Sequence, residues 1–383
     1  HEILMFKNKI YNYFFNEIFK NFFTILLTFS AIAWVVRAVN FLDLMVDDGY
    51  GSSIYFKYTL LNITTIITRF IPLAFLLSLT ISILKFERQQ ELLILWTTGL
   101  NKIKIVNIFL LISIFIALLQ ITLSFFVNPF LLNKSRSLLS NTETLDVNAL
   151  LKSNDFSDSF KGLTFYIDEK TINNELINIF IKDTGGNLNT IVDTVDEKKK
   201  STIIAERGFV DKGKLILFNG MIQSLNQKNE IKNVLFEKTE LSLNNISTRT
   251  IKQPKIQETS SVSLLTCVFN LENSLTLINC SKDFKNEAVQ TLSKRLGIPL
   301  YIPLISILTS FLLISKKEKA YNFLKKYMLF ILSFLILIFA EIFLKYTGLS
   351  SIMTMTYFII PVSATICFYI YLFRNIMTEK NSK

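Results

Sequence analysis

Residues 103–130 read IKIVNIFLLISIFIALLQITLSFFVNPF, a run in which Lys104 is the only charged residue. A helix of about 20 apolar residues crosses the hydrocarbon core of a bilayer, so this run predicts a membrane span. Beyond Phe130 the long apolar runs stop, and they return only near residue 296. The stretch therefore marks the border between a membrane-embedded part and an inserted part of different character.

Five further apolar runs have spanning length. Two precede the quoted run and three follow the insertion, at residues 21–41, 58–86, 296–314, 323–344 and 352–373. The sequence therefore predicts a membrane α + β fold with six transmembrane helices in a 3+3 arrangement. The predicted domains are residues 1–130, 131–292 and 293–383. At the start, FKNKIYNYFFNEIF (6–19) alternates aromatic and polar residues, which predicts an amphipathic helix on the membrane surface.

Lysine and arginine are unevenly distributed among the loops between the runs. The first loop is acidic, with Asp43, Asp47 and Asp48, and the short loop at 346–351 has no basic residue. The alternate loops and both ends of the chain carry the basic residues, which include Lys7, Lys9, Lys20, Lys85, Arg88, Lys102, Lys104, Lys316, Lys317, Lys319, Lys325, Lys326, Arg374, Lys380 and Lys383. Because basic loops stay in the cytoplasm, we expect cytoplasmic termini and an external insertion.

The composition limits the function classes. Half of the residues are hydrophobic (50%), and the formal net charge is +11. The basic residues lie mostly at the ends of apolar runs, where they meet lipid head groups, so nucleic-acid binding is not predicted. With a single histidine, His1, the sequence has no internal His for a His-based triad or a usual zinc site. Cys267 and Cys280 would pair in an oxidising compartment, but two unpaired small apolar residues is the favoured interpretation.

The insertion has the pattern of short β-strands. Alternating apolar segments of strand length, bounded by turn residues, are GLTFYID (162–168), ELINIFIKD (175–183), STIIAERGFV (201–210), GKLILFNGMIQSL (213–225) and KNVLFEKTELSL (232–243). They predict an antiparallel sandwich, jelly roll or open barrel. Such a domain either binds an unspecified partner or offers an apolar trough to a lipid, and periodicity does not separate the two.

Four basic residues near the spans are candidate contacts to an anionic lipid, because charge there is costly. Arg37 and Lys345 lie at the outer ends of spans one and five, where snorkelling is the simpler explanation. Arg69 lies in mid-span, and Glu341 of span five is one candidate partner. Arg295 precedes span four, where an elbow between domain and membrane is the simpler explanation.

The loop KFERQQELLILWTTGLNKIK (85–104) predicts a short amphipathic cytoplasmic helix. Glu87 and Glu91 have i, i+4 spacing on one face, Leu92, Leu95 and Trp96 share another, and Gly99 stands where a helix would end. The helix would lie on the inner leaflet or dock into a groove on a cytoplasmic partner, and its carboxylates favour docking. The sequence has no GxxxxGK[ST] motif, so any ATP must be bound by another chain.

In this arrangement the sequence resembles the LptF/LptG permeases of the lipopolysaccharide exporter. The matching residues are Glu91-Leu92 followed by Gly99, then Arg69 with Pro72, and then Glu287, Arg295 and Pro299. The family pattern has Ser before the glutamate, where this chain has Gln90. The strand series GLTFYID, NIFIKD, TIIAERG and LILFNG is similar to LptF more than to LptG.

The resemblance implies a Gram-negative inner-membrane protein whose β-jellyroll domain is periplasmic. The implied partners are a second permease subunit (LptG-like, or LptF-like if this chain is LptG), a dimer of the ATPase LptB, the bridge proteins LptC and LptA, and lipopolysaccharide. By the resemblance, Glu87, Arg88 and Glu91 contact the ATPase, on a helix that includes Leu95 and ends at Gly99. Arg37 meets lipid phosphates, where Asn40 replaces a second basic residue. The chain itself needs no cofactor and performs no bond-breaking chemistry.

Two other classes compete with this interpretation. Other ABC-type lipid or lipoprotein permeases have four spans and a large external domain after the first, which the predicted order disfavours. A membrane-anchored enzyme would need convergent polar residues, and Asp155, Asp158 and Asp168 lie in loops without such patterning. A membrane-anchored binding or sensor protein would be expected to carry a cytoplasmic signalling domain, and the sequence has none.

Overall fold

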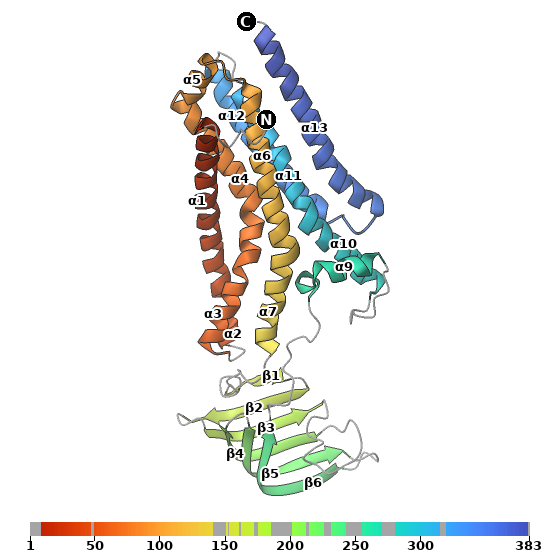
Figure 1. Cartoon of the computed structure of the whole chain (residues 1–383). Coiled ribbons are helices and arrows are strands. Elements are labelled where there is room, and N and C mark those ends of the chain that lie inside the picture. Colours follow the sequence, from red (N-terminus) through yellow and green to blue (C-terminus); the bar gives the residue numbers. More distant parts are fainter. Residues whose placement is uncertain are drawn as a thin grey trace. The chain divides into compact units, whose positions relative to one another are not determined.

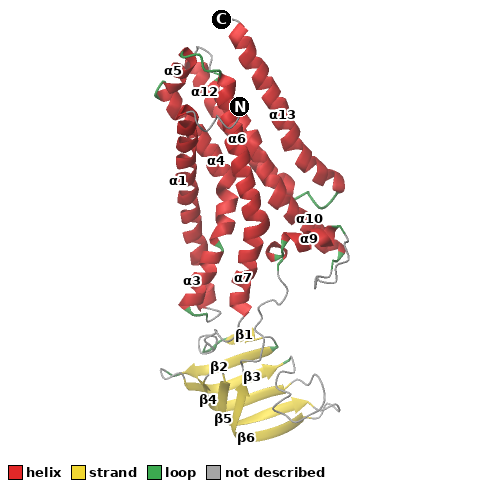
Figure 2. Ribbon diagram, viewed as in Figure 1, coloured by secondary structure: helices red, strands yellow, loops and turns green. Residues whose placement is uncertain are grey.

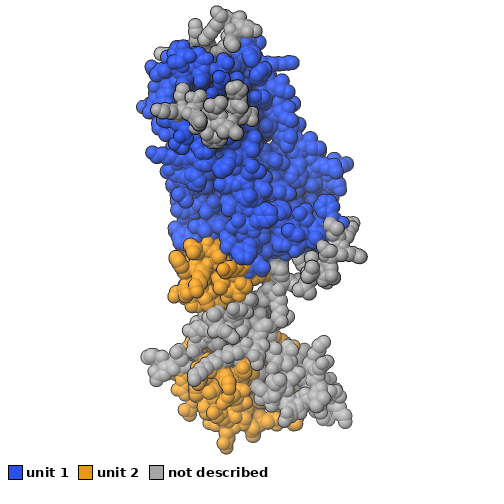
Figure 3. All heavy atoms as spheres, in the orientation of Figure 1, with its two compact units in different colours: residues 1–35, 62–133, 255–383 blue, residues 36–61, 134–254 orange. Residues whose placement is uncertain are grey.

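A computed structural model of the chain describes residues 9–46, 50–140, 151, 153–160, 162–171, 175–184, 201–211, 214–225, 231–242, 255–269, 280–314 and 319–381. Figures 1 and 2 show long helices and one β-sheet, as the sequence predicted. The chain divides into two compact units (Figure 3). Unit 1 comprises residues 1–35, 62–133 and 255–383, and unit 2 comprises residues 36–61 and 134–254.

The six predicted spans are confirmed within the described residues. Six helical stretches there are long and apolar enough to cross a membrane, namely Tyr11–Met45, Ser52–Arg88, Lys102–Leu139, Asp283–Leu313, Lys326–Leu344 and Ser351–Thr378. Most of the apolar window is buried inside the bundle in the second and fourth stretches (67% and 78%), against 17% in the first, fifth and sixth. The latter three helices therefore leave most of their apolar surface for lipid or another subunit.

The first span is one uninterrupted helix, α1 (Lys9–Asn40), of 32 residues. At about 1.5 Å per residue it is about 48 Å long, which exceeds the hydrocarbon core. Phe14, Ile18, Phe22 and Leu26, at i, i+4 spacing, are buried in the core of the helical bundle. The predicted separate surface helix over residues 6–19 is therefore wrong for its described part, because its aromatic face packs inside the bundle and continues the span.

The second and third spans supply most of the other residues of this core. A short helix α2 (Asp43–Val46) and α3 (Ser52–Leu61) precede α4 (Ile63–Arg88). The short α5 (Glu91–Thr97) separates α4 from α6 (Lys102–Thr122). The third span then passes through a π-helical turn, η2 (Leu123–Val127), into α7 (Asn128–Ser140), well beyond the predicted end at Phe130. Pro129 lies just after this π-helical turn. Because proline lacks a backbone N–H, it cannot donate the usual helical hydrogen bond, and the hydrogen-bond pattern of the helix changes at this point.

The C-terminal half begins before the predicted fourth span. The 3₁₀ turn η4 (Ile256–Glu258) and α9 (Ser261–Val268) precede α10 (Lys282–Gly297), η5 (Ile298–Leu300), α11 (Tyr301–Ser310), η6 (Phe311–Leu313), α12 (Lys319–Leu344) and α13 (Ser351–Asn381). Tyr301, Ala340 and Tyr357 belong to a second buried cluster that joins α11, α12 and α13. At Gly297 a Cβ would lie 2.3 Å from the ring of Tyr357, so only glycine allows this close packing.

In the described part of the insertion, one antiparallel sheet has six strands in the order β1-β2-β3-β4-β5-β6. The strands are β1 (Phe156–Phe160), β2 (Leu163–Lys170), β3 (Glu175–Asp183), β4 (Ser201–Asp211), β5 (Lys214–Leu225) and β6 (Ile231–Ser242). Five of them confirm the predicted strands, whereas β1 was missed. The sheet has a buried core of its own, which includes Leu163, Phe165, Ile179, Ile203 and Leu217. Of the turn residues that bound these segments, residues 185–187, 212–213 and 226–230 lie outside the described residues.

Candidate coupling segment and charged sites

The helix predicted within residues 85–104 is broken in two. α4 ends at Arg88, and Gln90 has a left-handed backbone (φ 59°) before α5 begins at Glu91. Glu87 and Glu91 therefore belong to different helices and do not form the single carboxylate face that their spacing predicted. A left-handed residue that is not glycine gives no strong signal in the sequence. The i, i+4 spacing of the two glutamates therefore wrongly predicted one continuous helix.

The end of α5 is where the sequence predicted it. Gly99 has a φ of +88°, its N–H donates to the carbonyl of Trp96 (3.2 Å), and the N–H of Leu100 donates to the carbonyl of Leu95 (3.1 Å). This pair of bonds is a Schellman motif, which requires a left-handed residue after the helix. Gly99 therefore fixes both the length of α5 and the direction of the chain into α6.

The two faces of α5 differ from the prediction in one respect. Leu92 is buried, and Leu95 and Trp96 pack against the core of the bundle. Leu93 and Ile94 instead expose 60% and 58% of their surfaces. Leu95, predicted as part of the coupling helix, thus anchors the helix to its own bundle, and the exposed apolar pair is the surface that α5 presents outward.

Three polar contacts tie this segment to other spans. Glu87 of α4 forms an ion pair with Lys326 of α12 at 2.7 Å. Glu91 accepts a hydrogen bond from the hydroxyl of Tyr13 of α1 at 3.1 Å. Lys85 forms an ion pair with Glu17, also of α1. A displacement of α5 would therefore act on the first span through Glu91, and a displacement of the end of α4 would act on the first and fifth spans through Lys85 and Glu87. Arg88 is exposed at the end of α4.

Arg295 lies in an elbow rather than on an open surface. It keeps only 6% exposure, and its guanidinium donates to Ser261 Oγ (2.6 Å) and to the carbonyls of Gln257 (3.0 Å) and Thr259 (3.1 Å). Ser261 in turn donates to the carbonyl of Phe125 in the π-turn at 2.5 Å. The guanidinium thus holds η4 and α9 against the third span, which supports the elbow explanation over lipid contact.

The elbow is closed by a disulfide. Cys267 in α9 bonds to Cys280, just before α10, with a Cα–Cα distance of 5.9 Å. The favoured prediction that these cysteines are unpaired is therefore wrong, because the fold of α9 against α10 brings them together across a sequence separation of 13. Ser281 then caps α10 by accepting from the N–H of Phe284 (3.3 Å).

In unit 1, charged residues of three spans lie within electrostatic range of one another. Lys294 of α10 is exposed and interacts electrostatically with Glu341 of α12 and Arg69 of α4. Arg69 and Glu341 are also exposed. Lys294 was missed, although it precedes Arg295 by one residue. Since adjacent helical residues point about 100° apart, one of the pair faces inward and the other outward.

The other two predicted lipid contacts lie at helix ends. Arg37 is half-buried near the end of α1, with its guanidinium 5.6 Å from the centre of the Phe41 ring. This cation–π contact orients the charge without neutralising it. Lys345 is exposed immediately after α12. Arg37 belongs to unit 2 and Lys345 to unit 1.

The described residues contain no group of three or more His, Cys, Asp and Glu side chains arranged to hold a metal ion. Of the aspartates considered as catalytic residues of an enzyme, Asp168 accepts a hydrogen bond from the Asn178 amide at 3.1 Å. Asp155 accepts one from the backbone N–H of Phe156, the next residue, at 2.8 Å. These bonds are local side-chain contacts of the sheet.

Comparison with known proteins agrees with this architecture. Over 161 residues the chain is 24% identical to an uncharacterised protein, RP871, of Rickettsia prowazekii (strain Madrid E), a match that covers 42% of this chain and 44% of that protein. The match thus spans less than half the length of that relative. The profile of the family described as "Lipopolysaccharide export system permease LptF/LptG" matches residues 12–375, nearly the whole chain. With its six apolar helices and inserted antiparallel sheet, the chain belongs to the LptF/LptG permease family.

Proposed function

We propose that the chain is one transmembrane subunit of an ABC-type lipopolysaccharide exporter, which takes lipopolysaccharide from the outer leaflet of the inner membrane and passes it to a periplasmic bridge. The observation that carries this proposal is the family match over residues 12–375. The match covers LptF and LptG together, and the strand series favours LptF. A second permease subunit, the ATPase LptB, and the bridge proteins LptC and LptA complete the proposed assembly.

The proposed orientation has cytoplasmic termini and a periplasmic sheet. It rests on the basic loops and is supported by the disulfide between Cys267 and Cys280, because such bonds persist in the oxidising periplasm and rarely in the cytoplasm. By the same orientation α5 faces the cytoplasm. Leu93 and Ile94 then expose apolar surface to water, which is typical of a docking site for another protein.

In the proposed mechanism α5 transmits the movement of the ATPase. ATP is bound by the partner ATPase, and this chain needs no cofactor of its own. When the ATPase closes on ATP, a docked α5 shifts as a rigid helix and moves the adjoining end of α4 with it. The Tyr13–Glu91 and Glu17–Lys85 contacts carry that shift to α1, and the Glu87–Lys326 pair carries it to α12. These are spans one and five, two of the three whose apolar surfaces are least buried.

On the outer side, basic residues provide contacts for the phosphates of the substrate. Arg37 and Lys345 stand at the ends of spans one and five, and Arg69 and Lys294 lie on the exposed sides of α4 and α10. Apolar walls would hold acyl chains, while these cations meet anionic head groups. Arg295 is left out of this set, because its hydrogen bonds are made within the elbow.

Docking through α5 is tested by replacing Leu93 and Ile94 together with Asp in the full chain co-expressed with the second permease and the ATPase. We expect at least a roughly tenfold loss of ATPase recovered with the complex, because two apolar anchors become charged. Gln89→Asp with Gln90→Asp is the matched control, since the pair adds the same two charges beside α5 at exposed polar positions. Glu91→Lys should also weaken the association. Unchanged recovery of the ATPase with the Leu93/Ile94 variant would refute docking through this surface.

A further inference from the structure

The outer face of the sheet carries an apolar stripe that crosses five strands. The strand pairings place side by side Tyr166 of β2, Phe180 of β3, Ile204 of β4, Met221 of β5 and Leu235 of β6. Neighbouring residues such as Ile179, Ile203 and Ile222 belong to the buried core. Because side chains alternate along a strand, the stripe lies on the face opposite that core.

A polar row runs beside the stripe, two residues along each strand. It consists of Asp168, Asn178, Glu206, Asn219 and Glu237, and the strand pairing skips this row in every ladder from β2 to β6. Asn178 and Asn219 have left-handed backbones (φ 53° and 49°), a conformation that asparagine tolerates better than most residues. Their amides donate to Asp168 (3.1 Å) and Glu206 (3.4 Å).

The row is a crease at which the pleat of the sheet changes phase. Along β3 the buried positions are Leu176 and then Ile179, and along β4 they are Ala205 and then Gly208. Each interval is three residues instead of two, so an extra residue points outward in each strand. The register continues unchanged on both sides of the row, so the phase changes at the same level in neighbouring strands.

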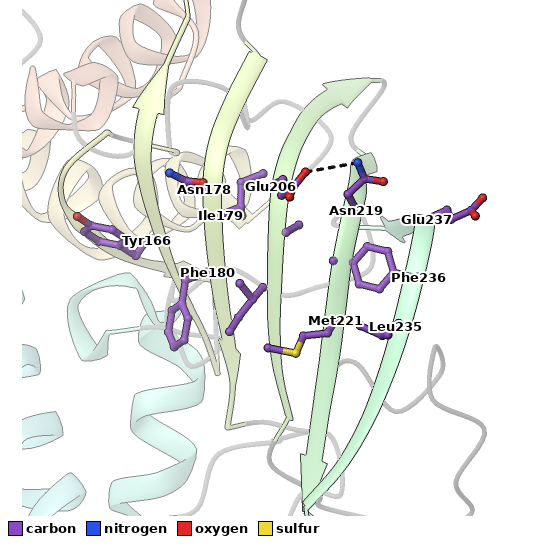
Figure 4. A pocket seen from close by; sticks show the side chains of 13 residues that line it. Tyr166, Asn178, Ile179, Phe180, Glu206, Asn219, Met221, Leu235, Phe236 and Glu237 are labelled. Atoms are coloured by element: carbon purple, nitrogen blue, oxygen red, sulfur yellow. Dashed lines mark hydrogen bonds between the residues drawn. The ribbon is translucent and has the colours of Figure 1, made fainter.

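Stripe and crease together line a groove with a volume of about 910 Å³ (Figure 4). In its wall the side chains of Glu206 and Glu237 stand at one end, and Met221 and Leu235 lie toward the other. The two charged residues that line it, Glu206 and Glu237, are both acidic. Ile204 and Leu235 expose 39% and 82% of their surfaces, so much of the apolar stripe is uncovered.

The groove restricts what can occupy it. β3, β4 and β5 are paired on both sides, so an extended peptide lying across them would find no backbone partners. A helix satisfies its own backbone groups, and the stripe crosses four inter-strand spacings, about 19 Å, which is the length of about 13 helical residues. The glutamates favour Lys or Arg on the flank of such a helix and disfavour the phosphates of an anionic lipid.

We infer that this groove is a docking surface for an amphipathic helix of a partner protein, with an apolar stripe flanked by basic residues. The helix would lay its apolar face across Phe180, Met221 and Leu235 and direct its cations toward Glu206 and Glu237. This surface is distinct from α5, so the inference does not depend on the proposed export function.

The test uses the full-length chain in nanodiscs, with Leu235 replaced by the photoreactive residue p-benzoylphenylalanine. The probes are two synthetic 14-residue helical peptides with the same leucine stripe, one flanked by lysines and one by glutamates. We expect the lysine peptide to give about tenfold more adduct at position 235. Replacing Glu206 and Glu237 together with Lys should reverse this preference, whereas Glu240→Lys, outside the groove, should leave it unchanged.

Equal adduct yields for the two peptides, or a preference that survives the double charge reversal, would overturn the inference. An adduct of position 235 with lipopolysaccharide vesicles that outcompetes the lysine peptide would also overturn it and would assign the groove to lipid. Each variant is accepted only if its thermal unfolding matches that of the parent chain. Unchanged recovery of the ATPase with the Leu93/Ile94 variant refutes docking through α5 alone, so the two proposals fail separately.

Discussion

Arg295→Lys separates the two explanations of this residue, because the substitution keeps the positive charge and removes the planar guanidinium. A phosphate contact would largely tolerate the change. The elbow would not, since three acceptors, Ser261 Oγ and the carbonyls of Gln257 and Thr259, lie 2.6, 3.0 and 3.1 Å from two guanidinium nitrogens. The shorter reach and single nitrogen of lysine do not reproduce that fork.

The expected cost follows from these bonds. A hydrogen bond to a charged group contributes about 1.5–3 kcal/mol, and an ammonium in this site would satisfy about one of the three acceptors. Losing two bonds therefore lowers the free energy of unfolding by roughly 3–5 kcal/mol. With an unfolding entropy of about 2.1 cal/mol/K per residue, a chain of 383 residues would then unfold at a temperature lower by roughly 4–6 °C.

The assay is thermal unfolding of the full chain in nanodiscs, followed by tryptophan fluorescence. Arg69→Lys is the control, because it makes the same chemical change at an exposed arginine and should move stability by less than about 0.5 kcal/mol. If Arg295→Lys unfolds at the temperature of the control while lipopolysaccharide crosslinking falls, the elbow assignment is refuted and Arg295 returns to the lipid contacts.

Three further outcomes are expected. Glu87→Lys alone should uncouple ATP hydrolysis from lipid transfer by removing the tie to α12, and adding Lys326→Glu should restore at least part of the coupling; no restoration would argue against transmission through this pair. Replacing Cys267 and Cys280 with Ser should lower stability by about 3 kcal/mol, the chain-entropy value for a separation of 13 residues, and equal stability of reduced and oxidised parent chains would contradict this. Gly99→Ala should cost about 1–2 kcal/mol and weaken ATPase association, because φ is +88° there, and unchanged recovery of the ATPase would show that the turn is adaptable.

The sequence predicted the parts of the fold that depend on local pattern. Apolar runs of spanning length and period-2 segments such as 175–183 each carry their own signal, and the structure has helices and strands there. The same holds for Gly99, whose role needs only a helix end. Strand β1 was missed because its sequence, FSDSF, lacks apolar alternation.

What the sequence did not predict depends on tertiary contacts. The break at Gln90 has no Gly or Pro to mark it, and so the partners of Glu87 and Glu91 lie on different spans. The burial of Arg295 requires α9 to fold back on the third span, and the same fold-back brings Cys267 to Cys280. The crease is visible only when the pairings of adjacent strands are aligned, since each asparagine alone is an ordinary strand residue.

The central claim is that this chain holds lipopolysaccharide at the outer end of its first span and releases it when the ATPase turns over. The direct test places p-benzoylphenylalanine at Val36, an exposed residue (59%) next to Arg37, in the complex with the second permease and the ATPase. We expect a lipopolysaccharide adduct that falls on addition of ATP and is weak in the Arg37→Glu variant of the intact complex. The account would be contradicted if no lipopolysaccharide adduct formed, or if the adduct yield changed neither on addition of ATP nor in the Arg37→Glu variant.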